Sequence, residues 1–146
     1  MKVMVRLFLI ILVSVFATGC ATSGPKFSEV IQTIPDLPAD SGRIYVYRAN
    51  SMVGAAAQPD VKLNGEVVGK STPGGFFYFD RKPGAYEITT ATEVDRKLSL
   101  NLEAGQTLYV RLDIAVGFFI GHLYPTLVEP EVARRDMQDC KHLAQK

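Results

Sequence analysis

Two cysteines offer the most distinctive chemistry in this 146-residue sequence, and they lie near its opposite ends. A cysteine thiol can be acylated, oxidised to a disulfide or bound to a metal, and its neighbours decide which reaction it meets. Cys20 directly follows the small residues Ala17, Thr18 and Gly19, and a short apolar run precedes them. Small residues after a short apolar stretch are typical of the cleavage site of a secretory signal peptide. The sequence therefore predicts that Cys20 becomes the first residue of a mature chain.

The first 19 residues have the parts of a signal peptide. Lys2 and Arg6 form a basic start, and the apolar run that follows spans residues 7–16. A run of about 10 residues is too short for a bilayer core, which needs about 20. Cleavage between Gly19 and Cys20 removes both basic residues, so the formal net charge changes from +1 to −1. Because neither sign dominates, we expect no nucleic-acid partner.

The order Ala-Thr-Gly-Cys resembles the lipobox of bacterial lipoproteins. That resemblance implies transfer of diacylglycerol to the Cys20 thiol, cleavage before Cys20 and acylation of its new amino group. Each buried methylene contributes about 0.8 kcal/mol, so several acyl chains hold a protein on the lipid bilayer. Ala21 stands where an aspartate would be the inner-membrane retention signal of enteric-type bacteria, so the resemblance implies an outer-membrane lipoprotein that faces the periplasm. The alternative is an ordinary secreted protein in which Cys20 has this position by chance.

The remaining candidate side chains form no complete catalytic or metal-binding pattern. The sequence contains no Gly-x-Ser-x-Gly or His-Glu-x-x-His motif, and Gly69-Lys70-Ser71 lacks the upstream glycine of a phosphate-binding loop. His122 and His142 are expected in loop or tail regions. Cys140 and His142 together would supply only two of the three or four ligands that zinc takes. We therefore predict no enzymatic activity, no cofactor and no metal, and a triad assembled from distant Ser, His and Asp residues stays open as the alternative.

Cys140 has no partner for an intramolecular disulfide if Cys20 is acylated. An unpaired thiol in an oxidising compartment is either a tolerated residue of the C-terminal tail or the site of a disulfide with another molecule. The sequence leaves both interpretations open.

The elements that must carry these residues are mainly β-strands. Pro and Gly residues punctuate residues 20–41, which are expected to form a mostly extended tether. Asn64-Gly65 between two apolar runs predicts a hairpin with a type I′ turn, because both central residues of that turn need positive φ. Strict alternation predicts strands with an apolar row facing the core and a polar row facing solvent. The apolar rows are Leu98, Leu100 and Leu102, then Leu108, Val110, Leu112 and Ile114, and the polar row of the second strand is Tyr109, Arg111 and Asp113.

About seven or eight short strands, with a turn signal about every 8–12 residues, predict an all-β fold, an antiparallel β-sandwich over residues 42–139. Glu131–Gln138 follows Pro130 and suits a short C-terminal helix. We expect this helix to cover an edge strand and thereby protect the sheet from pairing with neighbours. Residues 140–146 are expected to form a tail.

Two apolar stretches are candidates for contact with a partner. Phe76–Phe79 has apolar residues on both faces of a strand, so either both faces are covered or one contacts another molecule. Phe118, Phe119 and Ile120 lie between two glycines, as in a loop or a bent strand end. We predict core packing for the first stretch. The second is our candidate contact surface, with core packing as its alternative.

The order of strands and turns runs through Ile44–Arg48, Val61–Gly69 with its Asn-Gly turn, Phe76–Asp80 and Pro83–Tyr86. This order resembles the DUF2846 family of bacterial lipoproteins and, more distantly, PEGA-type and transthyretin-like β-sandwich modules. The resemblance spans about residues 40–138 and implies a fold, without any functional residues to carry over. The family has no assigned activity. Because the expected fold exposes edges and loops and the sequence shows no catalytic constellation, we expect a membrane-anchored envelope lipoprotein that acts as a non-catalytic interaction or accessory module, with an envelope protein as partner. The alternative is a β-sandwich that binds a small apolar or glycan ligand.

Overall fold

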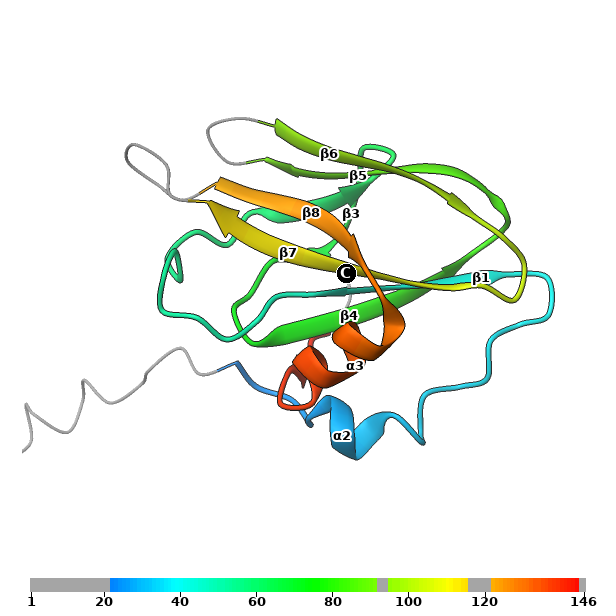
Figure 1. Ribbon diagram of the computed structural model, residues 1–146, viewed down its shortest axis with the longest axis horizontal. Helices are drawn as coiled ribbons and strands as arrows, with labels where there is room; N and C mark the ends of the chain where they lie inside the picture. The colour runs from blue at the N-terminus through cyan, green and yellow to red at the C-terminus, as the bar shows by residue number, and fades with distance from the viewer. Residues whose placement is uncertain (1–21, 92–94, 116–121, 145–146) are drawn as a thin grey trace, which may run out of the picture.

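The computed structural model describes residues 22–91, 95–115 and 122–144, which form a sandwich of two β-sheets. The strands are β1 (Gly42–Tyr47), β2 (Asp60–Leu63), β3 (Glu66–Lys70), β4 (Gly75–Arg81), β5 (Gly84–Ala91), β6 (Asp95–Leu102), β7 (Thr107–Ala115), β8 (His122–Val128) and β9 (Lys141–His142), and the helices are α2 (Phe27–Val30) and α3 (Pro130–Met137). The first sheet has the strand order β8-β7-β1-β4-β9, and the second has the order β3-β2-β5-β6. Figure 1 shows the sheets stacked, with both helices on the outer side of the first sheet. The predicted all-β sandwich is confirmed.

The main core lies between the two sheets and follows the predicted alternation. Leu100 and Leu102 of β6 are buried, and so are Val110 and Leu112 of β7. Their intervening neighbours on β6 face solvent, as expected of a strand with one covered face. Strand β1 differs because all six of its residues are buried. It lies in the middle of the first sheet, so the core covers one of its faces and a second cluster covers the other.

This second cluster, here called the outer cluster, covers the face of the first sheet that points away from the sandwich. Its members are Phe27, Tyr45, Tyr47, Phe76, Tyr109, Ala133, Met137 and Cys140. The prediction that Tyr109 faces solvent is therefore wrong, because α3 covers it and leaves it 4% exposed. Phe76 belongs to this cluster whereas Phe77 and Phe79 belong to the main core, so both faces of β4 are covered. Core packing of the Phe76–Phe79 stretch is confirmed.

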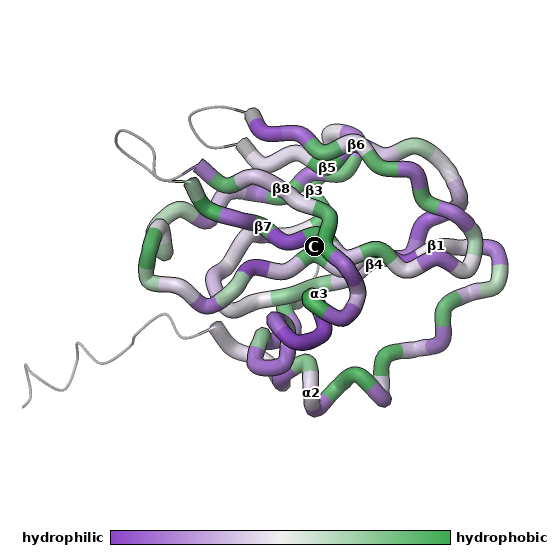
Figure 2. Tube along the Cα trace, in the orientation of Figure 1, coloured by the Kyte–Doolittle hydropathy of each residue, from purple (hydrophilic) through white to green (hydrophobic). Residues whose placement is uncertain are grey.

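The predicted C-terminal helix is present as α3, and its first turn begins with Pro130. Ala133 and Met137 are its buried residues, and Figure 2 shows the rest of the helix mainly in hydrophilic colours. The expectation that this helix covers an edge strand is wrong. It packs against β7, which has β8 and β1 as neighbours, so it covers a face of the sheet. Within the described residues, no helix has the length and apolar character needed to cross a membrane.

Strand pairing is antiparallel except in two pairs of the described strands. β1 pairs with β7, and β4 with β9, in parallel. The sequence pattern did not predict this, because alternation reports which face is covered and not strand direction. Strand β8 was also missed, since it contains Pro125, which lacks a backbone N–H. Proline is tolerated there because β8 lies at the edge of the sheet.

The predicted hairpin turn is confirmed at Asn64-Gly65, which connects β2 to β3. The φ angles are 48° at Asn64 and 87° at Gly65, both in the left-handed region that a type I′ turn requires. The Asn64 side-chain oxygen also accepts a hydrogen bond of 2.8 Å from the backbone N–H of Glu87. The turn is thereby fixed to the neighbouring strand β5.

The connections between strands meet at two ends of the sandwich. The first, here called the Thr22 end, carries Thr22, the β1–β2 loop (residues 48–59) and residues 71–74. Hydrogen bonds join Thr22 to Pro73 and Gly74 to Arg48 across these segments. The second, here called the opposite end, carries residues 35–41, 82–83 and 103–106. There the N–H of Gly105 donates to the carbonyl of Ser41 at 2.9 Å.

The described fold extends beyond the expected range 42–139 on both sides. Helix α2 precedes this range and contributes Phe27 to the outer cluster, and β9 follows it and pairs with β4. An isolated antiparallel β-bridge between Lys26 and Lys141 joins these two segments. The N-terminal and C-terminal parts of the described chain therefore form part of the fold.

Candidate functional site

Five residues that the sequence singled out lie outside the described residues: Gly19, Cys20, Phe118, Phe119 and Ile120. The described residues next to them show where each stretch joins the fold. Thr22 lies two positions after Cys20 and belongs to the Thr22 end. Ala115 pairs with His122, so the candidate contact residues lie in the connection of the β7–β8 hairpin.

The N-terminal segment, residues 22–34, is held against the fold from its first described residue. The Thr22 hydroxyl donates a hydrogen bond of 2.8 Å to the carbonyl oxygen of Pro73. The Phe27 N–H donates one of 2.8 Å to the carbonyl of Cys140. The expected extended tether over residues 20–41 is therefore packed on the domain over much of its described part.

Phe27 is the apolar anchor of this N-terminal segment. Its side chain is 4% exposed, and its ring meets those of Tyr45 and Phe76 edge-on, with centroids 6.1 Å and 5.3 Å apart. Each such aromatic pair contributes about 0.5–1.5 kcal/mol beyond the burial of area. The ion pair of Lys26 with Asp139 spans 2.7 Å but is solvent-exposed, so it adds little. The segment depends mainly on Phe27.

Cys140 was expected in a tail, but the structure places it in the outer cluster at 3% exposure. Its sulfur lies 3.7 Å from the carbonyl oxygens of Arg48 and Asp136. Burial raises the pKa of the Cys140 thiol to about 11 from its ordinary value of 9.0. The thiol is therefore neutral at physiological pH and inaccessible in the folded protein, so a disulfide with another molecule would require local opening.

Arg48 is a buried cation that organises the β1–β2 loop. It is 3% exposed, and burial lowers the pKa of its guanidinium, which nevertheless stays charged. One terminal nitrogen donates hydrogen bonds to the carbonyls of Ala57 at 2.6 Å and Ser71 at 2.9 Å. The other terminal nitrogen donates to the carbonyl of Gly54 at 2.7 Å. A single side chain thus connects three points of the Thr22 end.

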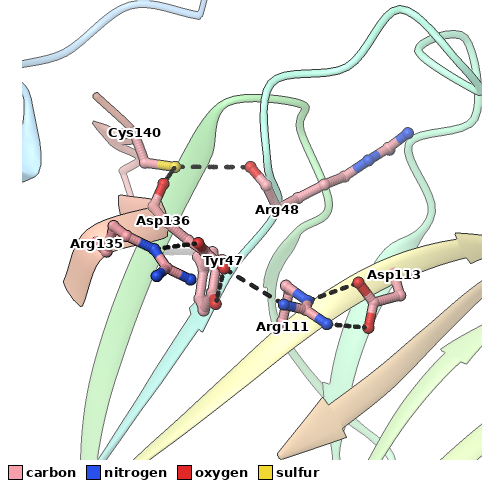
Figure 3. A network of polar contacts seen from close by, with 7 residues as sticks. All are labelled: Tyr47, Arg48, Arg111, Asp113, Arg135, Asp136 and Cys140. Carbon is pink, nitrogen blue, oxygen red and sulfur yellow. Dashed lines mark hydrogen bonds and ion pairs between the residues drawn. The ribbon is translucent and has the colours of Figure 1, made fainter. Parts of the chain in front are cut away.

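A network of charged residues joins α3 to the sheet near Arg48 (Figure 3). The Tyr47 hydroxyl donates to Asp136 at 3.1 Å, and Arg111 donates to Asp136 at 3.3 Å and to Asp113 at 2.6 Å. Burial raises the pKa of Tyr47. The hydrogen bond between Arg111 and Asp113 raises the pKa of Arg111. The tyrosine is therefore a neutral donor rather than a nucleophile. The arrangement fixes the helix on the sheet.

The two histidines lie in strands, so their expected placement in loop or tail regions is wrong. His122 begins β8 and His142 ends β9. The His142 ring stacks on Phe76 and Tyr78, with centroids 5.1 Å and 5.6 Å away, and its Nε2 atom is buried without a hydrogen-bond partner in the described chain. Within the described ranges, no three His, Cys, Asp or Glu side chains are grouped so that they could hold a metal ion.

Gly69-Lys70-Ser71 has a structural role at the end of β3. Ser71 is 1% exposed, and its hydroxyl donates a hydrogen bond of 2.8 Å to the carbonyl of Pro59. Gly69 lies directly against the ring of Phe77, where a side chain would not fit. These contacts close the β1–β2 loop and fill the core, and they leave no cradle for a phosphate group.

A surface hollow of about 410 Å³ lies at the Thr22 end. Its lining combines hydroxyl, amide and charged side chains with the apolar side chains of Met52, Ala55 and Pro73. The lining residues are Thr22, Asn50, Ser51, Met52, Ala55, Gln58, Thr72, Pro73, Gly74, Asp139 and Lys141. The N-terminal segment, the β1–β2 loop and the C-terminal part of the chain therefore share one surface.

Comparison with known proteins identifies the family. Residues 38–122 match the model of a family described as a protein of unknown function, DUF2846. The chain is also similar to an uncharacterized protein of Haemophilus influenzae, with 28% identity over 116 residues that cover 77% of this chain and 68% of the relative. The family match includes strands β1 to β7 and excludes Phe27, α3 and Cys140. Because the match covers more than half of its length, the chain belongs to the DUF2846 family.

Proposed function

We propose that the mature chain is a lipoprotein of the bacterial cell envelope, anchored through acylated Cys20 on the periplasmic face of the outer membrane. The observation that carries this proposal is the cysteine directly after Ala-Thr-Gly and a short apolar run. The position of Thr22 agrees with it, because the chain joins the fold only two residues after Cys20. Acylation there would hold the domain directly at a membrane surface.

We further propose that the domain is a non-catalytic interaction module. Three buried polar side chains described above have structural roles: Arg48 binds loop carbonyls, Tyr47 binds Asp136, and Cys140 packs in the outer cluster. None of these three is presented to a substrate at the surface. An envelope protein is the proposed partner, and Phe118, Phe119 and Ile120 remain the candidate contact residues.

Metabolic labelling tests the anchor. Cells that produce the protein are fed an alkyne analogue of palmitate, and the protein is purified and treated with an azide dye. We expect the wild type to be labelled and recovered with outer membranes, and the Cys20→Ala variant to be unlabelled and soluble. Equal labelling of both, or a soluble wild type, would contradict the proposal.

Crosslinking in cells tests the interaction module. The tagged lipidated protein and the Cys20→Ala variant are crosslinked, recovered and compared by mass spectrometry. We expect one envelope protein recovered only with the lipidated form, and expect a Phe118→Ser and Phe119→Ser double variant to stay folded while it loses that partner. If the double variant unfolds, these residues belong to the core instead.

The hollow at the Thr22 end supports a second candidate function, the binding of a small glycan. Its lining offers hydroxyl, amide and carboxylate groups from Thr72, Asn50 and Asp139, which suit sugar hydroxyls. The aromatic residues give no such support, since those in the outer cluster and the main core pack against one another. A thermal-shift screen with cell-wall saccharides tests this function. We expect a rise in Tm that an Asn50→Ala variant abolishes.

A further inference from the structure

The Thr22 end exposes apolar residues in a stretch of sequence without charge. Residues 49–59 and 71–75 contain no Asp, Glu, Lys or Arg. Among the described residues, Met52 and Val53 are the most exposed large apolar side chains, at 90% and 59%. Figure 2 shows the loop that carries them largely in hydrophobic colours. An exposed apolar pair in an uncharged loop is a feature of surfaces that contact another apolar phase.

Internal contacts fix this loop in place. Arg48 donates hydrogen bonds to carbonyls at two points within it, and Gly54 packs directly against the side chain of Ile114. The carbonyl of Met52 accepts from the N–H of Ala55 at 3.2 Å in a tight turn. Met52 and Val53 are therefore presented by a supported turn, although exposure in water costs free energy.

The position of the anchor relative to these residues follows from chain geometry. Thr22 and Met52 line the same hollow. Cys20 is two residues from Thr22, and two residues span at most about 7 Å. An acylated Cys20 therefore brings the bilayer surface to the end of the sandwich that carries Met52 and Val53.

We infer that the Thr22 end faces the bilayer and that Met52 and Val53 enter its headgroup–acyl boundary. This inference rests on the proposed lipid anchor. The lipid surface is the proposed contact of this exposed pair, because acylated Cys20 lies within about 7 Å of chain from Thr22, which lines the same hollow as Met52. Uncharged loops can approach acyl chains without burying an unpaired charge, which would be costly. The opposite end, with Asp40 and Lys82, then points away from the membrane.

Spin labelling of the full lipidated protein tests the inference. Single cysteines replace Met52, Val53 or Ala104, each exposed in a loop, and react with a nitroxide reagent. The native Cys140 does not compete, because it is 3% exposed. The labelled proteins are reconstituted into vesicles of phosphatidylethanolamine and phosphatidylglycerol. For Met52→Cys and Val53→Cys we expect more collisions with oxygen and fewer with a water-soluble nickel chelate than for Ala104→Cys, which lies at the opposite end.

The outcomes separate this inference from the anchor on which it rests. Vesicle flotation measures anchoring alone, and a lipidated protein that does not float overturns both proposals. A protein that floats while labels at 52 and 104 respond equally overturns the orientation and leaves the anchor intact. A label at position 52 that is shielded from both oxygen and nickel indicates a protein contact, such as a second copy of the chain, and also overturns the bilayer contact.

Discussion

The loops at the two ends of the sandwich differ in charge, in length and in how they are held. At the opposite end, the connections at residues 82–83 and 103–106 are tight turns, and Asp40 pairs with Lys82 in solvent. At the Thr22 end, a longer uncharged loop is held from inside by the buried Arg48. A polar turn is stable in water without such support. The difference indicates that the fold maintains the exposed apolar loop for contact rather than merely tolerating it.

The largest effect is expected when the N-terminal segment is released from the sheet. Phe27→Ala should lower the free energy of unfolding by about 3–5 kcal/mol, since it empties a buried aromatic site in the outer cluster. Ile31→Ala on the same segment is the matched control, because Ile31 is 40% exposed. Urea unfolding of both variants measures the difference. Equal midpoints would show that this segment does not depend on Phe27.

Replacing the buried cation should specifically weaken the Thr22 end. Arg48→Met leaves the carbonyls of Gly54, Ala57 and Ser71 without their donor, and we expect a loss of about 3 kcal/mol. Lys82→Met removes a charge of the opposite end, where the pair is exposed, and should leave the urea midpoint unchanged. A similar effect of both substitutions would remove the proposed difference between the ends.

The sequence predicted those parts of the fold that depend on residues close together in the chain. Asn64-Gly65 specified its turn because backbone sterics select these residues for positive φ. The alternating leucines of β6 specified a covered face. Pro125 concealed β8, because a proline argues against a strand unless the strand lies at an edge. Periodicity also gave no sign of the parallel pairing of β1 with β7.

The candidate site depends on contacts between distant parts of the sequence, and these were harder to predict. The cysteine motif predicted Cys20 as the anchor. Nothing in the residues near Phe27 predicted that Cys140 would be the neighbour of Phe27. Arg48 was missed because its partners are backbone carbonyls, which leave no residue pattern. No sequence pattern predicted that Met52 and Val53 are exposed. The one signal that could have found them is the absence of charged residues from the loop that contains them.

The pH dependence of stability offers a probe of the outer cluster. Because the pKa of Cys140 is raised to about 11 from 9.0, its stabilising contribution is fully present below pH 9 and is lost as pH rises through 11. This loss should reach about 2–3 kcal/mol. Burial also raises the pKa of Tyr45 and Tyr47, so their contributions add to the decline.

The contribution of the thiol is isolated by comparison with Cys140→Ala. Urea unfolding at neutral pH and at pH 11 should show a smaller decline for this variant than for the wild type. A thiol reagent at neutral pH should react slowly with the wild type and faster with Phe27→Ala, which uncovers the cluster. Identical pH profiles with and without the thiol would show that Cys140 is not buried in solution.

Two glycines, one at each end of the sandwich, allow the effect of adding a single Cβ atom to be compared. Gly54 and Gly105 have similar φ angles, +65° and +75°, so alanine meets the same backbone strain at both. At Gly105, in the opposite end, a Cβ would have no atom within 4 Å, and Gly105→Ala should cost only about 1 kcal/mol. At Gly54 the Cβ would overlap the end of the Ile114 side chain, so this variant should lose more, about 2 kcal/mol.

A double variant shows whether that additional loss comes from Ile114. Combining Gly54→Ala with Ile114→Val shortens the side chain that would be overlapped, so the pair should be less destabilised than the sum of the two single variants. The same Ile114→Val change combined with Gly105→Ala should be additive, because the two sites share no contact. Additivity in both combinations would mean that the β1–β2 loop does not pack on β7 in solution. Met52 and Val53 would then lack the supported turn on which their approach to the bilayer depends.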